Sequence, residues 1–324
     1  MEKITFSIII PTLNRSSYVI KIIKKLIISQ FNLEIIVCDS QSKDHTKEKL
    51  KYISQIYKHQ KIRYINFKEN NHSRKRNTGI KIAKGKYIIL LDDDCIPDKN
   101  FLKRYKKLFD LSKNKKIVIS GSVDYNFNTT NKNFIKYRQS RHFKLKNDYN
   151  FDKNFLDPKR VVVMNMGFEK KIVNKFNLFF DERFNRYGFE DFEFAFRLIK
   201  NKIKIISASP LVTHLDNRNF ETYLHKIKFI AFESSDYLIK INPEAAKTNN
   251  FIKLENNFLF KRLCKNKFIF NLTCKVEKIL IYIDKTLFYV PFIYKLSIAL
   301  AYLQGCYLKS QSNKKLLNLQ NWYK

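Results

Sequence analysis

The chain has few glycines, few prolines and few acidic residues for its length. Its 324 residues include 6 glycines and 6 prolines, and 29 acids are outnumbered by 63 lysines and arginines, for a formal net charge of +34. Such an excess attracts nucleic acids, anionic lipids and nucleotide phosphates alike. The same chain is rich in lysine, asparagine, isoleucine and phenylalanine and poor in alanine, which is the joint skew of an AT-rich genome. The charge alone therefore does not predict a nucleic-acid partner, and no recognisable nucleic-acid-binding module accompanies it.

Several common sequence patterns are also missing. The chain has no GxGxxG and no Walker glycine pattern, so neither that type of dinucleotide fold nor a P-loop is supported. Its 5 scattered cysteines fit neither a disulfide framework nor a zinc site, which favours a reducing cytosol. No basic region, apolar stretch and cleavage site precede the first apolar segment, so we expect no secretory signal. What is present is 44% apolar residues, enough for one large or two modest domains.

One stretch of the sequence, residues 86–97, combines an apolar run with a cluster of acids. The run at 87–91 has the length of a buried strand and stops at Asp92, Asp93 and Asp94. The acids therefore follow the carboxyl end of a strand, which is the edge where open α/β sheets bind ligands. Carboxylates at that edge suit a divalent cation paired with a nucleotide phosphate. A solvated polar turn after a strand is the alternative interpretation.

The segment before the acids predicts a parallel βαβ unit. Apolar strands at 5–10 and 34–38 flank a helix with Val19, Ile22, Ile23 and Leu26 at helical spacing, and Ser16 or Ser17 can cap it. A third strand is expected at 62–65. Parallel strands bring their carboxyl ends to one edge of the sheet, so a polar crevice is expected there.

The remainder of the chain predicts further strands and a second group of acids. We expect strands at 117–120, 161–168 and 203–207, with a polar, irregular region at 121–158. A helix after Gly188 has Phe192, Ala195, Phe196 and Ile199 on one face, which puts Glu190 and Asp191 in its first turn. Acids are electrostatically favoured in a first turn and need no catalytic role there.

Four ordered motifs together resemble family 2 glycosyltransferases of the GT-A fold. They are Ile-Pro-Thr-Leu-Asn-Arg (10–15), Val-Cys-Asp-Ser-Gln-Ser-Lys-Asp-His-Thr (37–46), Arg-Asn-Thr-Gly (76–79) and Leu-Asp-Asp-Asp (91–94). The resemblance covers roughly residues 4–220. It implies an α/β fold, a mixed, mainly parallel sheet flanked by helices. The catalytic domain is then expected at 1–220, and 221–324 forms a helical, basic and aromatic C-terminal extension.

The resemblance implies a donor-binding role for several residues at the strand ends. Pro11 and Thr12 would shape the nucleotide pocket, and Asp39 would bind the base. Ser40 stands where the family often has a second acid, so the identity of the nucleotide stays open. An ordinary turn acid is the alternative for Asp39. The other expected donor contacts are Arg76 near the phosphates, Asn77 holding that loop, Asp92 on the ribose and Asn165 on the donor sugar or acceptor. A solvated charge is the alternative for Arg76, and a strand-end turn residue for Asn165.

The resemblance also implies the catalytic and metal residues. The segment Gly188-Phe189-Glu190-Asp191 is similar to the Glu-Asp motif of this family and of galactosyl- and N-acetylgalactosaminyltransferases. Asp191 would deprotonate the acceptor hydroxyl, Glu190 would position acceptor or sugar, and Asp94 with His214 would hold Mn²⁺ or Mg²⁺. Inverting transfer needs one base opposite the leaving group and one group that stabilises the diphosphate, so this set is complete. An ordinary polar residue is the alternative for His214.

The expected function is an inverting, metal-dependent glycosyltransferase. By family precedent the donor is a UDP-sugar, and the acceptor is a glycan or lipid-linked saccharide in surface polysaccharide synthesis. The alternatives are a sugar-nucleotidyltransferase and a non-enzymatic basic protein that binds membrane or nucleic acid. The segment 278–307 is aromatic and basic but interrupted by Lys285, Pro291 and Lys295, so it suits the membrane interface better than a span. We therefore expect a cytoplasmic protein on the membrane surface that binds no nucleic acid, with an amphipathic helix packed on the catalytic domain as the alternative.

Overall fold

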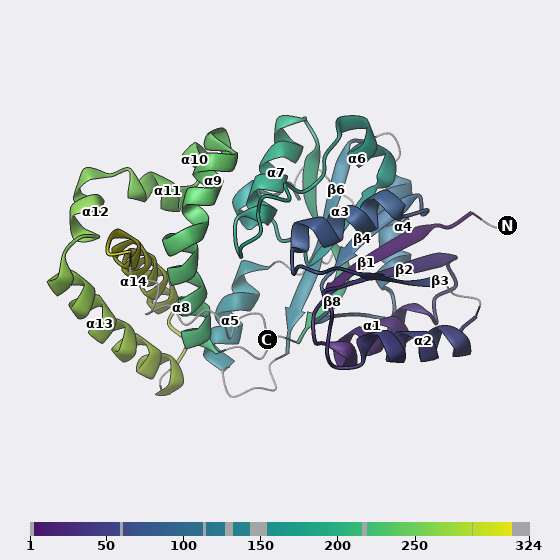
Figure 1. Ribbon diagram of the computed structural model, residues 1–324, viewed down its shortest axis with the longest axis horizontal. Coiled ribbons are helices and arrows are strands. Elements are labelled where there is room, and N and C mark those ends of the chain that lie inside the picture. Colours follow the sequence, from purple (N-terminus) through teal and green to yellow (C-terminus); the bar gives the residue numbers. More distant parts are fainter. Residues whose placement is uncertain are drawn as a thin grey trace.

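The computed structural model describes residues 3–58, 61–112, 115–126, 132–142, 154–215, 219–286 and 288–312. Figure 1 shows a sheet covered by helices on the right and a group of helices, coloured green to yellow, on the left. The expected fold, an α/β domain with a mixed, mainly parallel sheet followed by a helical region, is confirmed.

The sheet has 8 strands in the order β3-β2-β1-β4-β7-β6-β8-β5. The first four strands of that order are mutually parallel, which confirms the expected βαβ unit. β7 runs antiparallel to β4 and β6, and β8 is parallel to β6 but antiparallel to β5. The strands are β1 (Phe6–Thr12), β2 (Leu33–Asp39), β3 (Lys61–Asn66), β4 (Tyr87–Leu91), β5 (Cys95–Pro97), β6 (Ile117–Tyr125), β7 (Asn165–Glu169) and β8 (Lys204–His214).

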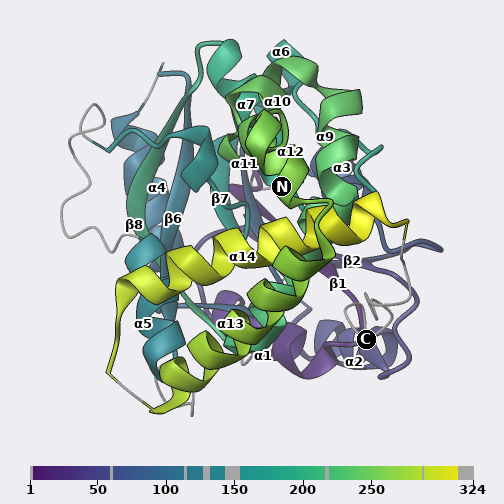
Figure 2. The same ribbon diagram turned by 90° about the vertical axis from the view of Figure 1, so that its left-hand side faces the viewer.

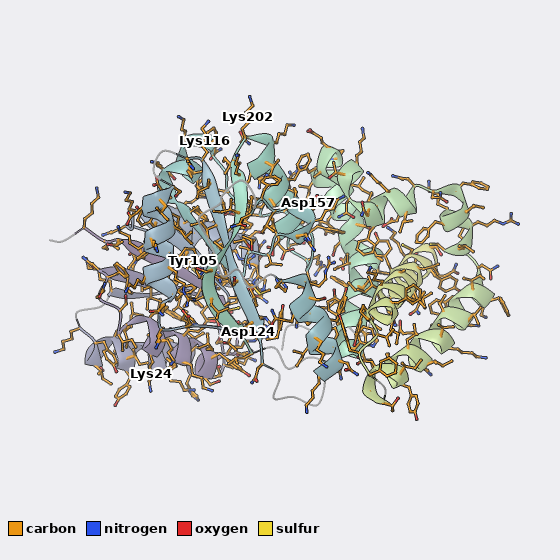
Figure 3. The ribbon with its side chains drawn as sticks, turned by 180° about the vertical axis from the view of Figure 1, so that it is seen from behind. Lys24, Tyr105, Lys116, Asp124, Asp157 and Lys202 are labelled. Carbon is orange, nitrogen blue, oxygen red and sulfur yellow. The ribbon has the colours of Figure 1, made fainter. Side chains whose placement is uncertain are left out.

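Two apolar cores cover the two faces of the sheet. One core contains the apolar sides of α1 (Ser16–Leu26), α2 (Thr46–Ile56) and α4 (Phe101–Leu111). The other contains those of α3 (His72–Ile82), α6 (Lys170–Phe176) and α7 (Glu190–Lys200). Figure 3 labels Tyr105 of α4, which is buried, whereas Lys24, Lys116 and Lys202 lie at the outside of this part and are exposed.

The sequence suggested Ser16 or Ser17 as the N-cap of α1, but the start of this helix is capped in another way. The backbone N–H of Ser16 donates to the Asp44 carboxylate at 2.6 Å, and neither serine side chain caps the helix. Asp44 lies in the loop after β2, so one carboxylate satisfies an orphan helix N–H and joins two loops at the carboxyl edge. The group that caps α1 is therefore Asp44, which lies 28 residues further along the chain than Ser16.

Three strands depart clearly from their predicted limits. β6 continues past the expected end at 120 to Tyr125, so the first residues of the region expected to be irregular belong to a strand. β7 begins at Asn165, because the chain at 161–164 turns its backbone toward other partners: Asp92 N–H donates to the carbonyl of Met164, and Val163 N–H donates to Asp191. β8 is a single strand that continues past the expected end to His214. Its pairing with β6 skips from Ala208 to Leu211. Pro210 lies in that gap and has no N–H to donate, so a bulge accommodates it.

The helical part has its own apolar core. Its helices are α5 (Lys132–Arg141), α8 (Phe220–Phe229), the π-helical η2 (Ile230–Ser234), α9 (Ser235–Ile241), α10 (Pro243–Thr248), α11 (Asn250–Glu255), α12 (Phe258–Leu263), α13 (Lys267–Thr286) and α14 (Pro291–Ser310); η1 (Pro158–Arg160) is a short 3₁₀ turn elsewhere. α5 lies in the region expected to be irregular. It is helical because Phe134 and Tyr137 are buried against Phe220 and Tyr294 of the later helices.

α14 lies between α13 and α8 (Figure 1). Its buried residues include Ile293, Tyr294 and an unbroken run from Ala301 to Cys306, and it contacts both α8 and α13. Burial thus accounts for the apolar character of most of 291–308, which the sequence had assigned to a membrane interface. Within the described residues, no helix is both long enough and apolar enough to cross a membrane.

Candidate active site

A cavity of 410 Å³ opens at the carboxyl edge of the parallel strands. Of the residues predicted for a site, Pro11, Arg76, Asp92, Asp94, Glu190, Asp191 and His214 line it. Thr12, Asp39, Asn77 and Asn165 are not among the residues that line it. Seven of the eleven residues predicted for a site therefore line one cavity, and the other four lie outside its lining.

The four supporting residues have side chains bonded to protein groups. Thr12 Oγ1 donates to Asp93 Oδ2 at 2.7 Å. Asp39 is fully buried, and its carboxylate accepts hydrogen bonds from Ser42 and, at 2.8 Å, from the hydroxyl of Tyr64. Asn77 donates to the carbonyl of Phe180 and accepts from its N–H, both at 2.8 Å, which ties α3 to the segment leading to α7. This tie agrees with the loop-holding role expected for Asn77.

Asn165 is a structural residue of the sheet in this arrangement. It is 1% exposed. Its amide oxygen accepts from the hydroxyl of Tyr105 at 2.7 Å, and its amide nitrogen donates to the carbonyls of Ser122 at 3.1 Å and Pro210 at 2.9 Å. These bonds join β7 to α4, β6 and the β8 bulge. The structure does not support the expected contact with donor sugar or acceptor, because the amide is buried away from the cavity.

Arg15 neutralises part of the acid cluster. Its Nη1 lies 2.5 Å from Asp94 Oδ2 and 3.0 Å from Asp93 Oδ1. Burial raises the pKa of Asp93 to about 7, against the opposing charge of Arg15 and with a further increase from Asp94. The adjacent carboxylates are therefore held together by a guanidinium, as like charges at this spacing require. Arg15 was not predicted to be a site residue, although it belongs to the motif at 10–15.

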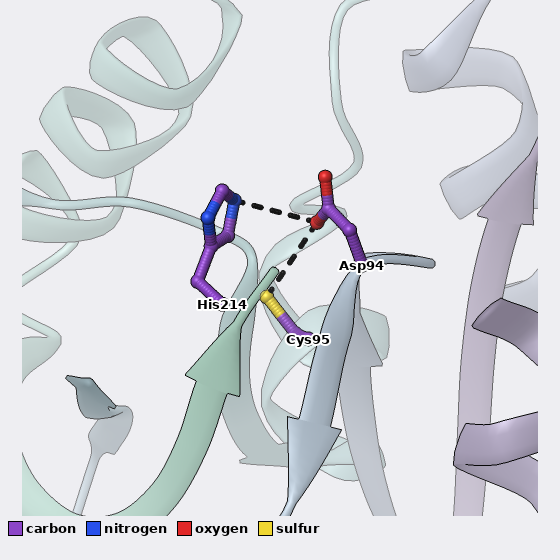
Figure 4. Close-up of side chains that lie close together, drawn as sticks. All are labelled: Asp94, Cys95 and His214. Carbon is purple, nitrogen blue, oxygen red and sulfur yellow. Dashed lines mark hydrogen bonds and ion pairs between the residues drawn. The ribbon is translucent and has the colours of Figure 1, made fainter. Parts of the chain in front are cut away.

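The other oxygen of Asp94 faces His214. Asp94 Oδ1 lies 3.4 Å from His214 Nε2 and 3.8 Å from Cys95 Sγ (Figure 4). The strand register explains this meeting, since Cys95 of β5 pairs with His214 at the end of β8. One ligand atom from each residue lies within 4.8 Å of the other two. A first-row divalent ion about 2.1 Å from a carboxylate oxygen and an imidazole nitrogen needs about 3 Å between them, so Asp94 and His214 fit such an ion.

Cys95 was not predicted as part of this group. Burial, with added repulsion from Asp94, raises the pKa of its thiol well above the ordinary value. Its Sγ–H donates weakly to Asp94 Oδ1, and a thiolate is a soft ligand that suits zinc or copper better than Mn²⁺ or Mg²⁺. The oxygen and nitrogen donors that remain are those of a hard to borderline cation such as Mn²⁺.

Arg76 joins the acid cluster to the second pair of acids. Its Nη2 donates to Asp92 at 3.1 Å, and its Nη1 lies 3.7 Å from Asp191 Oδ1. The guanidinium carbon also lies 5.5 Å from the centre of the Phe180 ring. Because the side chain of Arg76 is only 5% exposed, the two carboxylates are its main compensation for burial. Arg76 thus sets the separation of Asp92 and Asp191.

Asp191 has one oxygen fixed by a backbone N–H and one beside Arg76. Its Oδ2 accepts a hydrogen bond from Val163 N–H at 3.1 Å, whereas Oδ1 is buried, lies 3.7 Å from Arg76 Nη1 and has no hydrogen-bond partner among the described residues. Burial raises the pKa of Asp191 to about 7, against the charge of Arg76 and with additions from Glu190 and Asp92. A carboxylate with this pKa that lines a cavity is suited to accept a proton near neutral pH.

The turn before Asp191 is strained and packed against the helical part. Phe189 has a φ of 71° and Gly188 a φ of 108°, both in the left-handed region. Gly188 N–H donates to Glu190 at 3.0 Å, and burial raises the pKa of Glu190 while Arg76 lowers it. The hydroxyl of Ser234 donates to the carbonyl of Tyr187 at 2.6 Å, so η2 holds the turn in place.

The helical part also supplies one wall of the cavity. Phe134 and Arg138 of α5, and Tyr223, Lys226, Phe229 and Ile230 of α8 and η2, all line it. Lys226 Nζ lies 4.6 Å from the centre of the Tyr187 ring, beside the Asp191 turn. Arg138 lies 4.5 Å from the Tyr125 ring, which is itself 5.3 Å from the His214 ring. The predicted domain boundary near residue 220 did not indicate that these residues belong to the site. Their helical spacing is the one sequence feature that suggests they share a face.

Sequence comparisons identify the family to which this arrangement corresponds. The family model described as "Glycosyl transferase family 2" matches residues 7–175, just over half of the chain. An uncharacterized glycosyltransferase of Methanocaldococcus jannaschii is 30% identical over 235 residues, 70% of this chain and 76% of that protein. The chondroitin synthase of Pasteurella multocida is 30% identical over 230 residues, 61% of this chain but only 23% of that protein.

Solved structures support the same fold. The mannosyltransferase PcManGT from Pyrobaculum calidifontis, in complex with GDP-Man and Mn²⁺, has a TM-score of 0.62 at 13% identity, covering 97% of this chain and 89% of that chain. GalNAc-T7 with UDP, GalNAc and Mn²⁺ has a TM-score of 0.52 at 17% identity, covering 76% of this chain and 52% of that chain. At such identities the likeness concerns the fold, which is that of GT-A glycosyltransferases.

Proposed function

The chain belongs to glycosyl transferase family 2, and from this premise we propose that it is an inverting, metal-dependent glycosyltransferase. It moves a sugar from a nucleotide-diphosphate donor, a UDP-sugar, to a hydroxyl group of a glycan or lipid-linked saccharide in surface polysaccharide synthesis. Family membership disfavours the two alternatives, a sugar-nucleotidyltransferase and a non-enzymatic basic protein. The similarity to a chondroitin synthase supports the proposed class of acceptor.

Asp191 is the proposed catalytic base, and the place of its carboxylate in the lining of the cavity, oriented by Val163 and Arg76, is the observation that carries the proposal. An acceptor hydroxyl in the cavity donates its proton to the Asp191 carboxylate as its oxygen attacks the anomeric carbon. The bond from that carbon to the nucleotide diphosphate breaks on the opposite side, which inverts the configuration. Val163 N–H holds Oδ2 and Arg76 lies beside Oδ1, so these two groups fix the direction of the carboxylate. Glu190, anchored on Gly188 N–H, orients the acceptor or sugar beside it.

Asp94 and His214 are the proposed metal ligands. A divalent cation bound there supplies positive charge to the leaving diphosphate, so that no protein acid is needed. Arg15 holds Asp94 Oδ2 and leaves Oδ1 directed toward His214. The Mn²⁺ in both structural neighbours supports this choice of ion, and Mg²⁺ has the same preference for oxygen ligands.

The donor occupies the side of the cavity formed by the strand ends. Asp92 binds the ribose, and Arg76 keeps Asp92 in place while its own charge faces the phosphates. Pro11 forms the wall beside the base, and Thr12 and Asp39 act from behind that wall. GDP-mannose in one neighbour and UDP in the other support a nucleotide-diphosphate donor and leave the base to experiment.

A donor screen tests the proposed function. The full chain is incubated with Mn²⁺ and a panel of UDP- and GDP-sugars, and release of the nucleoside diphosphate is measured with and without saccharide acceptors. We expect turnover of a UDP-sugar that Asp191→Asn abolishes. Tight nucleotide-sugar binding without turnover in any acceptor mixture, or turnover unchanged in Asp191→Asn, would contradict the proposal.

A further inference from the structure

The outward side of α13 carries large apolar side chains among lysines. Seven exposed residues lie at roughly helical spacing on this side of α13. The α13 outer face consists of Phe268, Leu272, Lys275, Lys278, Ile279, Tyr282 and Lys285. Phe268 is 73% exposed and Tyr282 is 67% exposed. Figure 2 looks at this end of the molecule, where α13 and α14 lie in front of the sheet. Apolar side chains gathered on an exposed face usually mark an interaction surface.

The acids of the same region are turned inward. Among the described residues between 253 and 312 the acids are Glu255, Glu277 and Asp284, and none of them is exposed. Glu277 accepts from Lys228 of α8 at 2.6 Å, and Asp284 accepts from the hydroxyl of Tyr294 of α14. Glu255 pairs with Lys309 at 3.0 Å. Internal pairing therefore leaves the exposed charge of this region entirely positive.

We propose that the α13 outer face binds the surface of an anionic lipid bilayer. Lysines beside an anionic leaflet are attracted to it, and aromatic and aliphatic side chains on the same helix face enter the headgroup boundary. The surface differs from the segment that the sequence suggested, because half of α14 is buried, whereas one side of α13 packs in the helical core and its other side is exposed. The inference goes beyond the proposed transferase activity, since it involves no residue of the cavity.

Two other occupants fit the same face less well. RNA would use the lysines and could stack bases on Phe268 and Tyr282, but it would leave Leu272 and Ile279 without a stacking role. A second copy of the chain would bring lysines against lysines, which is unfavourable. A bilayer accommodates the cationic, aromatic and aliphatic groups together.

Vesicle co-sedimentation of the full chain tests the proposal. The lipids are phosphatidylcholine alone and phosphatidylcholine with phosphatidylglycerol. Each lysine near an anionic surface strengthens binding about fivefold. Lys275→Gln/Lys278→Gln/Lys285→Gln should therefore bind the mixed vesicles on the order of a hundredfold more weakly than the unchanged chain. Leu272→Ser/Ile279→Ser keeps the charge and should weaken binding at least about tenfold, because it removes the inserted side chains.

A matched control lies on α2 and the turn that follows it, in the α/β part of the molecule (Figure 1). Lys47→Gln/Lys51→Gln/Lys58→Gln removes the same number of exposed lysines, and Ile56→Ser removes an aliphatic side chain that is 55% exposed. Both should sediment as the unchanged chain does, and thermal melts should confirm that every variant folds.

Three results would overturn the proposal. They are equal loss of binding in the α2 control, equal binding to pure phosphatidylcholine, and no binding to either kind of vesicle while the chain binds polyuridylate.

Discussion

The α/β part and the helical part contribute to the cavity in different ways. The α/β part supplies the ionised groups, and each is fixed by a partner: Arg15 holds Asp94, Arg76 holds Asp92, and Val163 holds Asp191. The helical part supplies a wall of aromatic and cationic side chains, and it packs against the turn before Asp191 through Ser234. The chemistry therefore depends on paired charges at strand ends, and the shape of the site depends on helices that follow in the chain.

The largest expected effect concerns the metal in the α/β part. Chelation by EDTA should abolish transfer, and Mn²⁺ should restore it, because the leaving diphosphate loses its stabilising charge. Asp94→Asn and His214→Ala should each weaken Mn²⁺ binding by at least about 100-fold, measured by calorimetry. Cys95→Ser is the control and should bind Mn²⁺ as before, since cysteine sulfur is a soft ligand that Mn²⁺ does not prefer. Full activity in EDTA would remove the metal from the mechanism.

The next effect isolates Asp191. Asp191→Asn keeps the size and most of the hydrogen bonding of the side chain but cannot accept a proton. The rate of single-turnover transfer at saturating substrates should fall by about 100- to 10,000-fold, while donor affinity and the melting temperature stay near those of the unchanged chain. Asp110→Asn, an exposed acid paired with Lys106 on α4, is the control. A rate within about threefold of the unchanged chain would exclude Asp191 as the base, because general-base catalysis contributes far more.

The pH dependence of the reaction sharpens the same comparison. The base must be ionised to accept a proton, and burial raises the pKa of Asp191 to about 7. Hence kcat/KM should rise with pH, by about tenfold per unit below pH 7, and level off above it. The measurement is a pH–rate profile at fixed Mn²⁺ and ionic strength. A profile that is flat between pH 5 and about 8 would mean that this carboxylate does not limit the reaction.

The smallest expected effect tests whether the helical part holds the catalytic turn. Ser234→Ala removes the hydrogen bond to the carbonyl of Tyr187 and should cost about 1 kcal/mol of stability. It should also lower kcat several-fold, because the turn that carries Asp191 becomes less well fixed. Ser54→Ala, which removes a local bond on exposed α2, should change neither quantity. An unchanged kcat in Ser234→Ala would mean that the two parts act independently.

Sequence alone determined the α/β fold and the carboxyl-edge site. Apolar strands that stop at polar residues must place those residues at one sheet edge, whatever the details of packing. That reasoning placed Asp92 and Asp94 at the edge, whereas Asp191 was assigned to the same site by the family resemblance; all three line one cavity. The sequence also predicted the acid-bearing first turn of α7, because helical spacing of apolar residues fixes which residues begin the helix.

Only the tertiary structure decided which polar residues reach the cavity and which support it. Asn165 and Asp39 look like site residues in the sequence, yet their partners, Tyr105 and Tyr64, lie on other elements and hold them inside the protein. Arg15 acquires its role only when β1 and β4 bring its loop beside Asp94. The same holds for α14, whose apolar residues could have faced lipid or protein until α8 and α13 covered them. A pattern of residue types specifies local structure, whereas the partner of a buried polar or apolar group is set by distant segments that only folding brings together.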